Sequence, residues 1–240
     1  MRGGRITPDL AWRAELTAAG LRAADRVVAP SGAFATMLQH CYGLDSTPVV
    51  VRNGRRALRL VERPQQDFAF TAGRLWDGGK NIAALNRAAA LTNVPVRAAG
   101  PVRGPHGEAV SFQSLQALGS LDEGALADQL AVRPIFVSAA VYEPFGLAVL
   151  EAAQAGCALI LSDIPTFREL WDGAARFVYP HDAEGYARAL DELVASPELR
   201  ARLGAQAQER AADYTVERMA DAMLSLYRGL PASAPERVAA

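Results

Sequence analysis

Short apolar runs and longer amphipathic stretches alternate along the chain from residue 67 onward. The apolar runs have the length of buried strands, and they lie at 68–72, 95–99, 134–138, 157–161 and 175–178. The stretches with helical periodicity lie at 80–91, 122–130, 145–155, 165–171, 182–195, 197–212 and 215–230. Between 102 and 120 the pattern is weaker, and we interpret 110–112 as a short strand. Strands that alternate with helices predict parallel pairing through right-handed crossovers, so the predicted fold class is α/β with a Rossmann-like, doubly wound parallel sheet.

The residues before 67 contain a smaller set of the same elements. Helical periodicity at 10–24 precedes an apolar run at 26–29, and a second helix from Ser31 precedes a second apolar run at 48–51. These two apolar strands have no predicted sheet to join, so we expect a partner chain, a second copy or helices to cover them. We divide the chain into a partial N-terminal α/β segment, a basic linker, a main domain, a C-terminal crossover helix and a disordered tail, at 1–54, 55–66, 67–213, 214–230 and 231–240.

The strongest chemical signal is the decapeptide at 142–151, Tyr-Glu-Pro-Phe-Gly-Leu-Ala-Val-Leu-Glu, between a predicted strand and a predicted helix. The first turn of that helix would expose the amides of Phe145, Gly146 and Leu147. Free amides and the helix dipole together attract a phosphate or diphosphate. Glu143 and Glu151 would repel such an anion, but they fit if they accept hydrogen bonds from hydroxyls on either side of it. Taken singly, Glu143 is an ordinary acidic residue before a helix, and Glu151 is an ordinary residue of a solvated helix face.

A second signal follows the first apolar run of the main domain, at 73–81, Gly-Arg-Leu-Trp-Asp-Gly-Gly-Lys-Asn. Arg74 has a planar fork that suits phosphate oxygens, and Lys80 adds a point charge at the start of a predicted helix. A lysine there opposes the helix dipole, which favours an anionic partner. Alone, the loop is equally typical of two solvated cations. Because ligands of doubly wound sheets bind at the carboxyl ends of strands, we expect Gly73, Arg74 and Lys80 to face the decapeptide across a cleft.

Composition limits the other possibilities. The 240 residues are 50% hydrophobic and 21% charged, with a net charge of -1, which gives no field that would attract nucleic acid or an anionic membrane. No window reaches the apolar length of a membrane span, so we expect a soluble protein without stable membrane insertion. Cys41 and Cys157 form neither a metal motif nor a disulfide framework, which favours a cytoplasmic setting. His40, His106 and His181 share no ligand spacing, and we expect no metal site.

The order of these motifs resembles glycosyltransferase family 4, the retaining enzymes of the GT-B fold. The resemblance extends over nearly the entire chain, and its most specific part is the pair Glu143 and Glu151, with seven residues between them and an internal Phe-Gly. The weaker motifs are Ala29-Pro30-Ser31, Asn53-Gly54, Gly73-Arg74 with Lys80, Ala155-Gly156 and Tyr214. The resemblance implies a C-terminal donor-binding half with a remnant of the N-terminal acceptor domain, because the glycine-rich loop and cleft histidine of that domain have no counterpart here.

The resemblance also implies roles for the site residues. The residues that would bind a nucleotide-diphosphate sugar are Gly73, Arg74, Lys80, Glu143, Phe145, Gly146, Leu147 and Glu151. Arg74, Lys80 and Glu143 would be catalytic, with the two cations stabilising the leaving nucleotide and Glu143 contacting the donor sugar. Glu151 would bind the ribose hydroxyls. No cofactor is implied, because cationic side chains and the helix end replace a metal ion. The expected function is transfer of a sugar, with retention, to an unidentified acceptor.

Two other hypotheses compete with an active glycosyltransferase. The chain could be a catalytically incomplete nucleotide-sugar-binding module, or a subunit that needs a separate chain carrying the acceptor domain. It could also be a structural or interaction protein, since a fold alone does not give a function. Nothing structural requires Arg74, Lys80, Glu143 and Glu151 together, which argues against that last hypothesis. We further predict a turn at Asn53-Gly54 and backbone contacts to the nucleotide base around 118–120.

Overall fold

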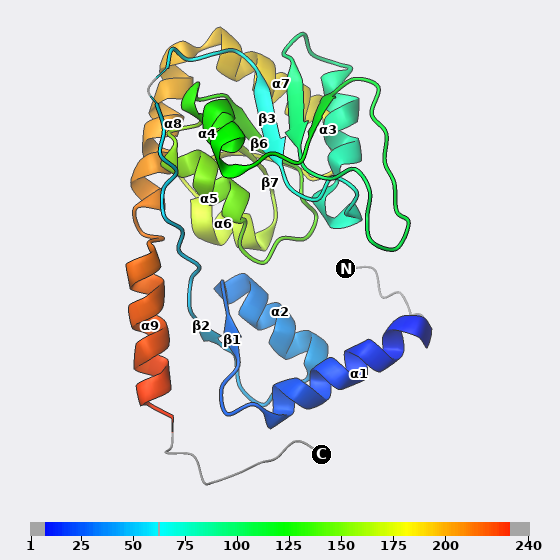
Figure 1. Ribbon diagram of the computed structural model, residues 1–240, viewed down its shortest axis with the longest axis vertical. Helices are drawn as coiled ribbons and strands as arrows, with labels where there is room; N and C mark the ends of the chain where they lie inside the picture. The colour runs from blue at the N-terminus through cyan, green and yellow to red at the C-terminus, as the bar shows by residue number, and fades with distance from the viewer. Residues whose placement is uncertain (1–7, 62, 231–240) are drawn as a thin grey trace.

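The computed structural model describes residues 8–61 and 63–230, and within them the main feature is a six-stranded parallel sheet (Figure 1). Its strands are β3 (Ala69–Ala72), β4 (Val96–Ala99), β5 (Gln116–Gly119), β6 (Ile135–Ser138), β7 (Leu159–Ser162) and β8 (Arg176–Val178). Their order is β5-β4-β3-β6-β7-β8, so the chain moves outward from β3 and then returns to the middle at β6. The reversal between β3 and β6 is the point where doubly wound sheets bind ligands. The predicted fold class is confirmed.

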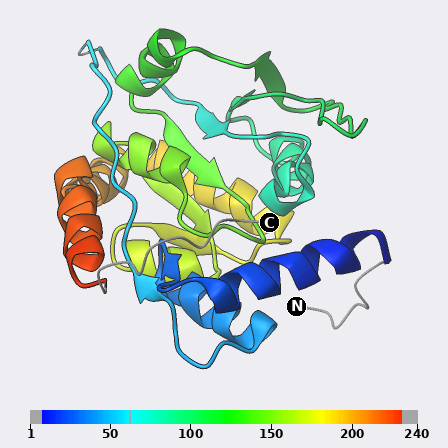
Figure 2. The ribbon, with the colours of Figure 1, turned by 60° about the horizontal axis from the view of Figure 1, so that its bottom comes forward.

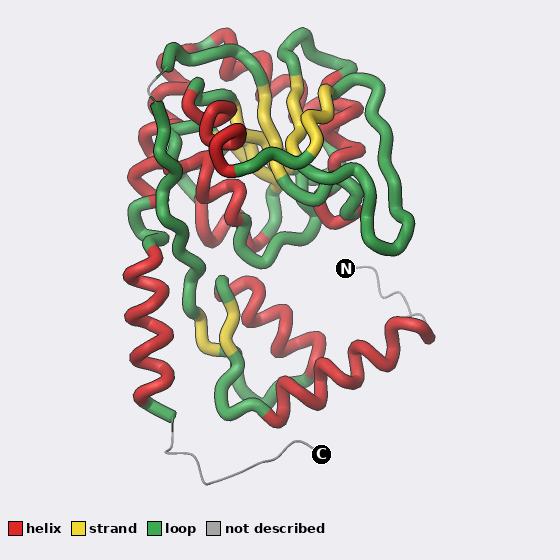
Figure 3. The backbone as a smooth tube through the Cα atoms, viewed as in Figure 1, coloured by secondary structure: helices red, strands yellow, loops and turns green. Residues whose placement is uncertain are grey.

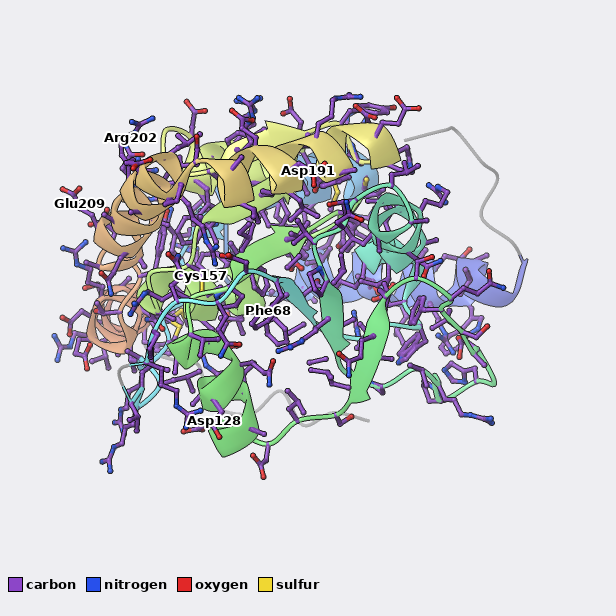
Figure 4. The ribbon with its side chains drawn as sticks, turned by 90° about the horizontal axis from the view of Figure 1, so that it is seen from above. Phe68, Asp128, Cys157, Asp191, Arg202 and Glu209 are labelled. Atoms are coloured by element: carbon purple, nitrogen blue, oxygen red, sulfur yellow. The ribbon has the colours of Figure 1, made fainter. Side chains whose placement is uncertain are left out.

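Helices cover both faces of this sheet, because successive strand residues point to opposite sides. Phe70 and Phe136 belong to one core, whereas their neighbours Ala69 and Ile135 belong to the other. The second core is covered by α3 (Ile82–Ala89) and α7 (Ala183–Ala195). The helices that contribute to the first are α4 (Glu123–Ala131), α5 (Leu147–Gln154), α6 (Pro165–Trp171) and α8 (Pro197–Ala211). Figure 4 shows the sheet between α7 and α4, with Phe68 and Cys157 in the interior.

The N-terminal elements form a second, two-stranded parallel sheet with two helices. They are α1 (Pro8–Ala23), β1 (Val28–Ala29), α2 (Gly32–Tyr42) and β2 (Val49–Val50). The predicted cap at Ser31 is present, since its side chain accepts a hydrogen bond from the Phe34 amide, and Gly43 ends α2 with a left-handed φ of 58°. Helix α2 contacts both short strands, but Val49 and Val50 remain exposed. The helical cover that we expected is therefore only partial.

Helix α2 is tied to the larger sheet's layer through α6. Glu169 of α6 accepts hydrogen bonds from the amides of Gly32 and Ala33, at 2.9 and 2.7 Å. The Ser31 hydroxyl donates to the Pro144 carbonyl at 2.8 Å. Figure 2 shows α1 and α2 below the sheet layer. The free backbone amides in the first turn of α2 thus donate to a carboxylate from a different layer of the molecule. The negative charge of Glu169 also stabilises the positive end of the helix dipole of α2.

An extended segment joins the two sheets, and the described residues between β2 and β3 lie in neither helix nor strand (Figure 3). The turn predicted at Asn53-Gly54 is wrong, because neither residue has a positive φ and the chain stays extended there. Glycine is required at position 54 for a different reason, the close approach of another backbone. A Cβ on Gly54 would lie 1.9 Å from the carbonyl oxygen of Thr215, the residue before α9 (Val216–Arg228). The boundaries at 54 and 66 stay predictions, and the predicted tail at 231–240 lies outside the described residues.

The strand predicted at 110–112 is wrong. Val110 and Phe112 pack against the core from outside, while Val110 also donates its amide to the Val102 carbonyl. The strand that pairs with β4 is β5, whose residues are exposed or half-buried because it forms the edge of the sheet. An edge strand needs no apolar run, so the sequence pattern did not reveal it.

Replacing the buried Arg200 with methionine is expected to destabilise the fold. The Arg200 side chain is 2% exposed, forms an ion pair with Asp67 at 2.6 Å and donates to the carbonyls of Gln66 and Arg133 at 2.6 and 2.8 Å. We expect Arg200→Met to lower the free energy of unfolding by about 2–3 kcal/mol in urea denaturation, since each hydrogen bond to a charged group contributes about 1.5–3 kcal/mol. Arg202→Met, on the exposed side of the same helix (Figure 4), is the control and should stay within about 0.5 kcal/mol. Equal losses for the two variants would show that Arg200 does not anchor α8.

Candidate active site

A cleft of about 360 Å³ lies at the switch point, at the carboxyl ends of β3 and β6. The predicted site residues that line it are Gly73, Arg74, Lys80, Glu143, Phe145, Gly146 and Leu147. Glu151 does not line this cleft, whereas Asn53 of the extended segment does. The fold therefore brings the two sequence motifs together, and adds a residue from the segment that joins the two sheets.

The floor of the cleft depends on a close approach of two backbones. A Cβ on Gly100, after β4, would lie 1.7 Å from the Gly73 carbonyl oxygen, after β3. Gly100 also has a φ of 136°, which side chains rarely adopt. The Gly73 amide donates to the Ala99 carbonyl at 2.9 Å. Glycine at these two strand ends lets neighbouring loops meet without side chains between them.

The Arg74 guanidinium is 62% exposed and lies at the rim of the cleft. It forms an ion pair with Asp77 at 2.7 Å, and its Cζ lies 5.6 Å from the centre of the Trp76 ring. Asp77 also accepts a hydrogen bond from the Gly79 amide, which fixes its position. Arg74 is therefore held by a neighbour of its own loop, with guanidinium donors remaining for a ligand.

Lys80 forms an ion pair with Glu143 across the cleft, and the two side chains are 24% and 13% exposed. The predicted helix is present, but the prediction that it starts at Lys80 is wrong. Lys80 ends a short 3₁₀ turn (Gly78–Lys80), and α3 begins at Ile82. Asn81 separates them with a left-handed φ of 52°, and its side-chain Nδ2 donates to the carbonyls of Ala139 and Pro180. The anionic partner that we expected for Lys80 is a protein carboxylate in this structure.

Helix α5 begins two residues later than predicted, at Leu147, with Gly146 as the N-cap at a φ of 96°. The Leu150 amide makes the first helical hydrogen bond, to the Gly146 carbonyl. Among the described residues, no backbone acceptor is present for the amides of Leu147, Ala148 and Val149. Free amides at this end of a helix favour an anion. The amides of Phe145 and Gly146, just before the helix, likewise have no backbone acceptor among the described residues, so their predicted part in anion binding stays a prediction. The Phe145 side chain is buried, with its ring against Tyr214.

Glu151 is the least exposed of the predicted acidic residues, at 7%, so its interpretation as a solvated helix residue is wrong. Its Oε1 forms an ion pair with the Nε of Arg55 at 2.5 Å. Burial raises the pKa of the Glu151 carboxyl, and the negative charge of Glu123 raises it further, whereas Arg55 lowers it. Sequence reasoning missed Arg55, because it was assigned to a linker; the signal was a basic pair directly after Asn53-Gly54.

A second hollow of about 310 Å³ continues from Gly73 and Arg74 toward the ends of β4 and β5. It is lined by Gly100 and Pro101 on one side and by Ser120 and Leu121 on the other. Of the stretch at 118–120, only Ser120 lines this hollow, and the predicted contact with the nucleotide base stays a prediction. The two hollows share Ala72, Gly73 and Arg74.

Comparison with known proteins places this site in context. Residues 113–210 match the family model described as glycosyl transferases group 1. The chain is 30% identical over 223 residues to a phosphatidyl-myo-inositol mannosyltransferase from Mycolicibacterium smegmatis, a match that covers 88% of this chain and 53% of that protein. It is 28% identical to a D-inositol 3-phosphate glycosyltransferase from Streptomyces scabiei, over 92% of this chain and 57% of that one. The chain thus spans about half the length of these curated relatives.

Solved structures agree in fold. A sucrose-phosphate synthase from Thermosynechococcus elongatus superposes with a TM-score of 0.76 at 21% identity, over 93% of this chain and 63% of that one. Anabaena HepE in complex with UDP-glucose superposes with a TM-score of 0.79 at 16% identity, over 91% and 68% of the two chains. The chain is thus similar in sequence to glycosyltransferases, and its parallel-sheet α/β fold is shared with these solved structures.

Two further observations concern the surroundings of the site. No helix within residues 8–61 and 63–230 is both long and apolar enough to cross a membrane. In the same part of the chain, no three His, Cys, Asp or Glu side chains gather as a metal ion would need. Cys41 and Cys157 are free thiols, the first exposed and the second buried.

Replacing Gly146 with alanine is expected to destabilise the start of α5. The added Cβ would lie 3.0 Å from the Phe167 ring, at a φ of 96° that alanine disfavours. We expect a loss of about 2 kcal/mol in the free energy of unfolding, of which about 1 kcal/mol comes from the backbone conformation. Gly173→Ala isolates that part, because Gly173 has a φ of 78° and open space around it. Equal losses would contradict the tight packing of Gly146 against α6.

Proposed function

We propose that this chain is the donor-binding half of a glycosyltransferase, which moves a sugar with retention from a nucleotide-diphosphate sugar to an acceptor. The main observation behind this proposal is the cleft at the switch point. Arg74, Lys80 and Glu143 line this cleft together with the first residues of α5, whose amides are free. Similarity to glycosyltransferases of family group 1 supports the proposal, as does the likeness in fold to a protein solved with UDP-glucose. Membership of family 4 is part of the same proposal.

The diphosphate would lie against the first turn of α5, with Arg74 and Lys80 as its cationic partners. In this structure both cations are paired with carboxylates, Arg74 with Asp77 and Lys80 with Glu143. A diphosphate would compete for Lys80, and the released Glu143 would accept hydrogen bonds from hydroxyls of the donor sugar. The ligand thus supplies both an anion and hydroxyl donors, which replaces one charge pairing by another without leaving a buried charge alone.

Catalysis in this proposal is electrostatic. As the bond between the sugar and the diphosphate breaks, negative charge grows on the leaving phosphate oxygens, beside Arg74, Lys80 and the amides of Leu147–Val149. Donors that are already oriented there stabilise this charge more than they stabilise the intact donor, so the barrier falls. The acceptor hydroxyl oxygen would bond to the sugar from the face that the diphosphate leaves, as the bond from the sugar to the diphosphate breaks, and the hydroxyl proton would pass to the leaving phosphate oxygen. The cations and the helix end would take the part of a metal ion, so we propose that no divalent metal is needed.

Completion of the site by an acceptor-binding half is a second part of the proposal. The small sheet has two strands with exposed Val49 and Val50, and no residue from Leu10 to Ala23 is buried. Helix α9 likewise has no buried residue although its apolar side chains share one face. Parallel sheets are normally covered on both faces. We propose that a further α/β polypeptide, upstream in a longer protein or on a separate chain, covers this surface and holds the acceptor.

Nucleotide binding tests the proposal directly. We expect UDP, GDP or ADP to bind the purified chain in calorimetric titration without divalent metal, with UDP as the first probe. Arg74→Ala should weaken binding by about tenfold or more, because a charge-assisted hydrogen bond is worth about 1.5–3 kcal/mol and each 1.4 kcal/mol is tenfold. Added EDTA should leave the affinity unchanged.

Arg202→Ala is the matched control, because Arg202 is an exposed arginine outside the cleft. Absence of binding by the folded chain to all three nucleotides would reject the donor-binding proposal. Binding that requires Mg²⁺ would reject only its metal-independent part. Sugar transfer to an added acceptor by the chain alone would reject the need for an acceptor-binding partner.

A further inference from the structure

The ion pair between Glu151 and Arg55 joins the buried carboxylate of α5 to the extended segment between the sheets. The Glu151 side chain is 8% exposed and that of Arg55 is 37% exposed, so the pair closes the carboxylate off from one side. The closest atoms of the pair are the Glu151 Oε1 and the Arg55 Nε, 2.5 Å apart. The carboxylate is therefore held by a cation that comes from outside its own helix.

The backbone of Arg55 is held from two sides, so its guanidinium does not come from a loose loop. The Gln154 side chain, one turn after Glu151, donates to the Arg55 carbonyl at 2.8 Å. The Arg55 amide donates to the Tyr214 carbonyl at 3.4 Å, next to the close approach of Gly54 and Thr215. Gln208 of α8 in turn donates to the Gln154 carbonyl at 3.0 Å. Helices α5 and α8 therefore fix the point from which Arg55 reaches Glu151.

The charges around Glu151 make this contact necessary. Burial and Glu123 of α4 raise the pKa of the Glu151 carboxyl, and the one opposing charge among the described residues is Arg55. Gln154 and Gln208 are neutral. Loss of Arg55 would therefore raise the pKa of Glu151 further, and the carboxyl would bind a proton at a higher pH than in the unmodified chain. A protonated carboxyl accepts hydrogen bonds from hydroxyls less well than a carboxylate does.

We propose that Arg55 is a positioning residue that holds the Glu151 carboxylate in its charged form and in a fixed orientation. The ligand part of this inference rests on the proposed function, together with the ribose-binding role that the family resemblance implies for Glu151. The effect on Glu151 itself does not. Arg55 acts through Glu151, and it needs no contact with the ligand.

The test compares four variants of the full chain with the unmodified chain. Arg55→Gln removes the charge, Arg55→Lys retains it, and Glu151→Gln removes the titrating group. Arg56→Gln is the matched control, because Arg56 is adjacent, exposed and without an ion-pair partner among the described residues. UDP affinity is measured between about pH 5.5 and 8. The affinity of each variant is divided by the affinity of the unmodified chain at the same pH, which cancels the effect of phosphate ionisation.

We expect Arg55→Gln to weaken UDP binding by about tenfold at the lowest pH, with the loss shrinking as pH rises and Glu151 ionises. Arg55→Lys should restore most of the affinity at low pH. Glu151→Gln should bind UDP weakly, and the ratio of its affinity to that of the unmodified chain should not change with pH. Arg56→Gln should bind UDP as tightly as the unmodified chain does. A merely structural role of Arg55 would give a loss that does not change with pH, and that outcome would overturn the proposal.

A second readout requires no ligand. The carboxyl carbon of Glu151, assigned by its absence in Glu151→Gln, is followed by ¹³C NMR through a pH titration. Its midpoint should rise in Arg55→Gln, return toward the original value in Arg55→Lys and stay unchanged in Arg56→Gln. An unchanged midpoint in Arg55→Gln overturns the proposal, whatever happens to UDP. A raised midpoint in a chain that binds no nucleotide supports the action of Arg55 on Glu151 and rejects the donor-binding function instead.

Discussion

The reversal of strand order between β3 and β6 is the constraint on which the site depends. Because β4 and β6 lie on opposite sides of β3, the loops that leave β3 and β6 turn away from each other and leave space between them. Arg74 and Lys80 follow β3, and Glu143 follows β6, so residues about 60–70 positions apart come to one edge of the sheet. The glycines at 73 and 100 then bring the β3 and β4 loops together, which extends the space toward Ser120.

Charge compensation is the second organising feature of this edge. Arg74 is paired with Asp77, Lys80 with Glu143, and Arg55 with Glu151, so each cation of the site already has a carboxylate. For the largely buried Lys80, Glu143 and Glu151 such pairing avoids an isolated buried charge, which is strongly unfavourable. For the exposed Arg74 it contributes little. The same pairing would make ligand binding selective. A bare phosphate would compete for the cations but leave the carboxylates unpaired. A ligand with both phosphates and hydroxyls would provide partners for the cations and for the carboxylates.

The sequence predicted the fold well because buried parallel strands leave apolar runs: β3, β6 and β7 are mostly apolar and mostly buried, and β4 departs from this only at the half-buried Arg97. The edge strand β8 was also predicted, although only Val178 in it is buried. The prediction failed at β5, an edge strand whose pairing is by backbone, and at the start of α5, where only the φ of Gly146 decides the first helical residue. The motif residues were found by residue type, but the contact from Arg55 to Glu151 spans 96 positions and depends on how the extended segment crosses α5. No local pattern contains that information.

The small N-terminal sheet and the candidate active site are mechanically joined, although they belong to different layers. Ser31 donates to the carbonyl of Pro144, the residue after Glu143, and Glu169 holds the first turn of α2. Asn53 lines the cleft, and Arg55 reaches Glu151 from the same segment. A polypeptide that covered the exposed strands would therefore press on α2 and on this segment, both of which touch residues of the cleft. If the proposed acceptor-binding half covers these strands, its binding and the ordering of the proposed donor site should be coupled, because the same backbone contacts serve both.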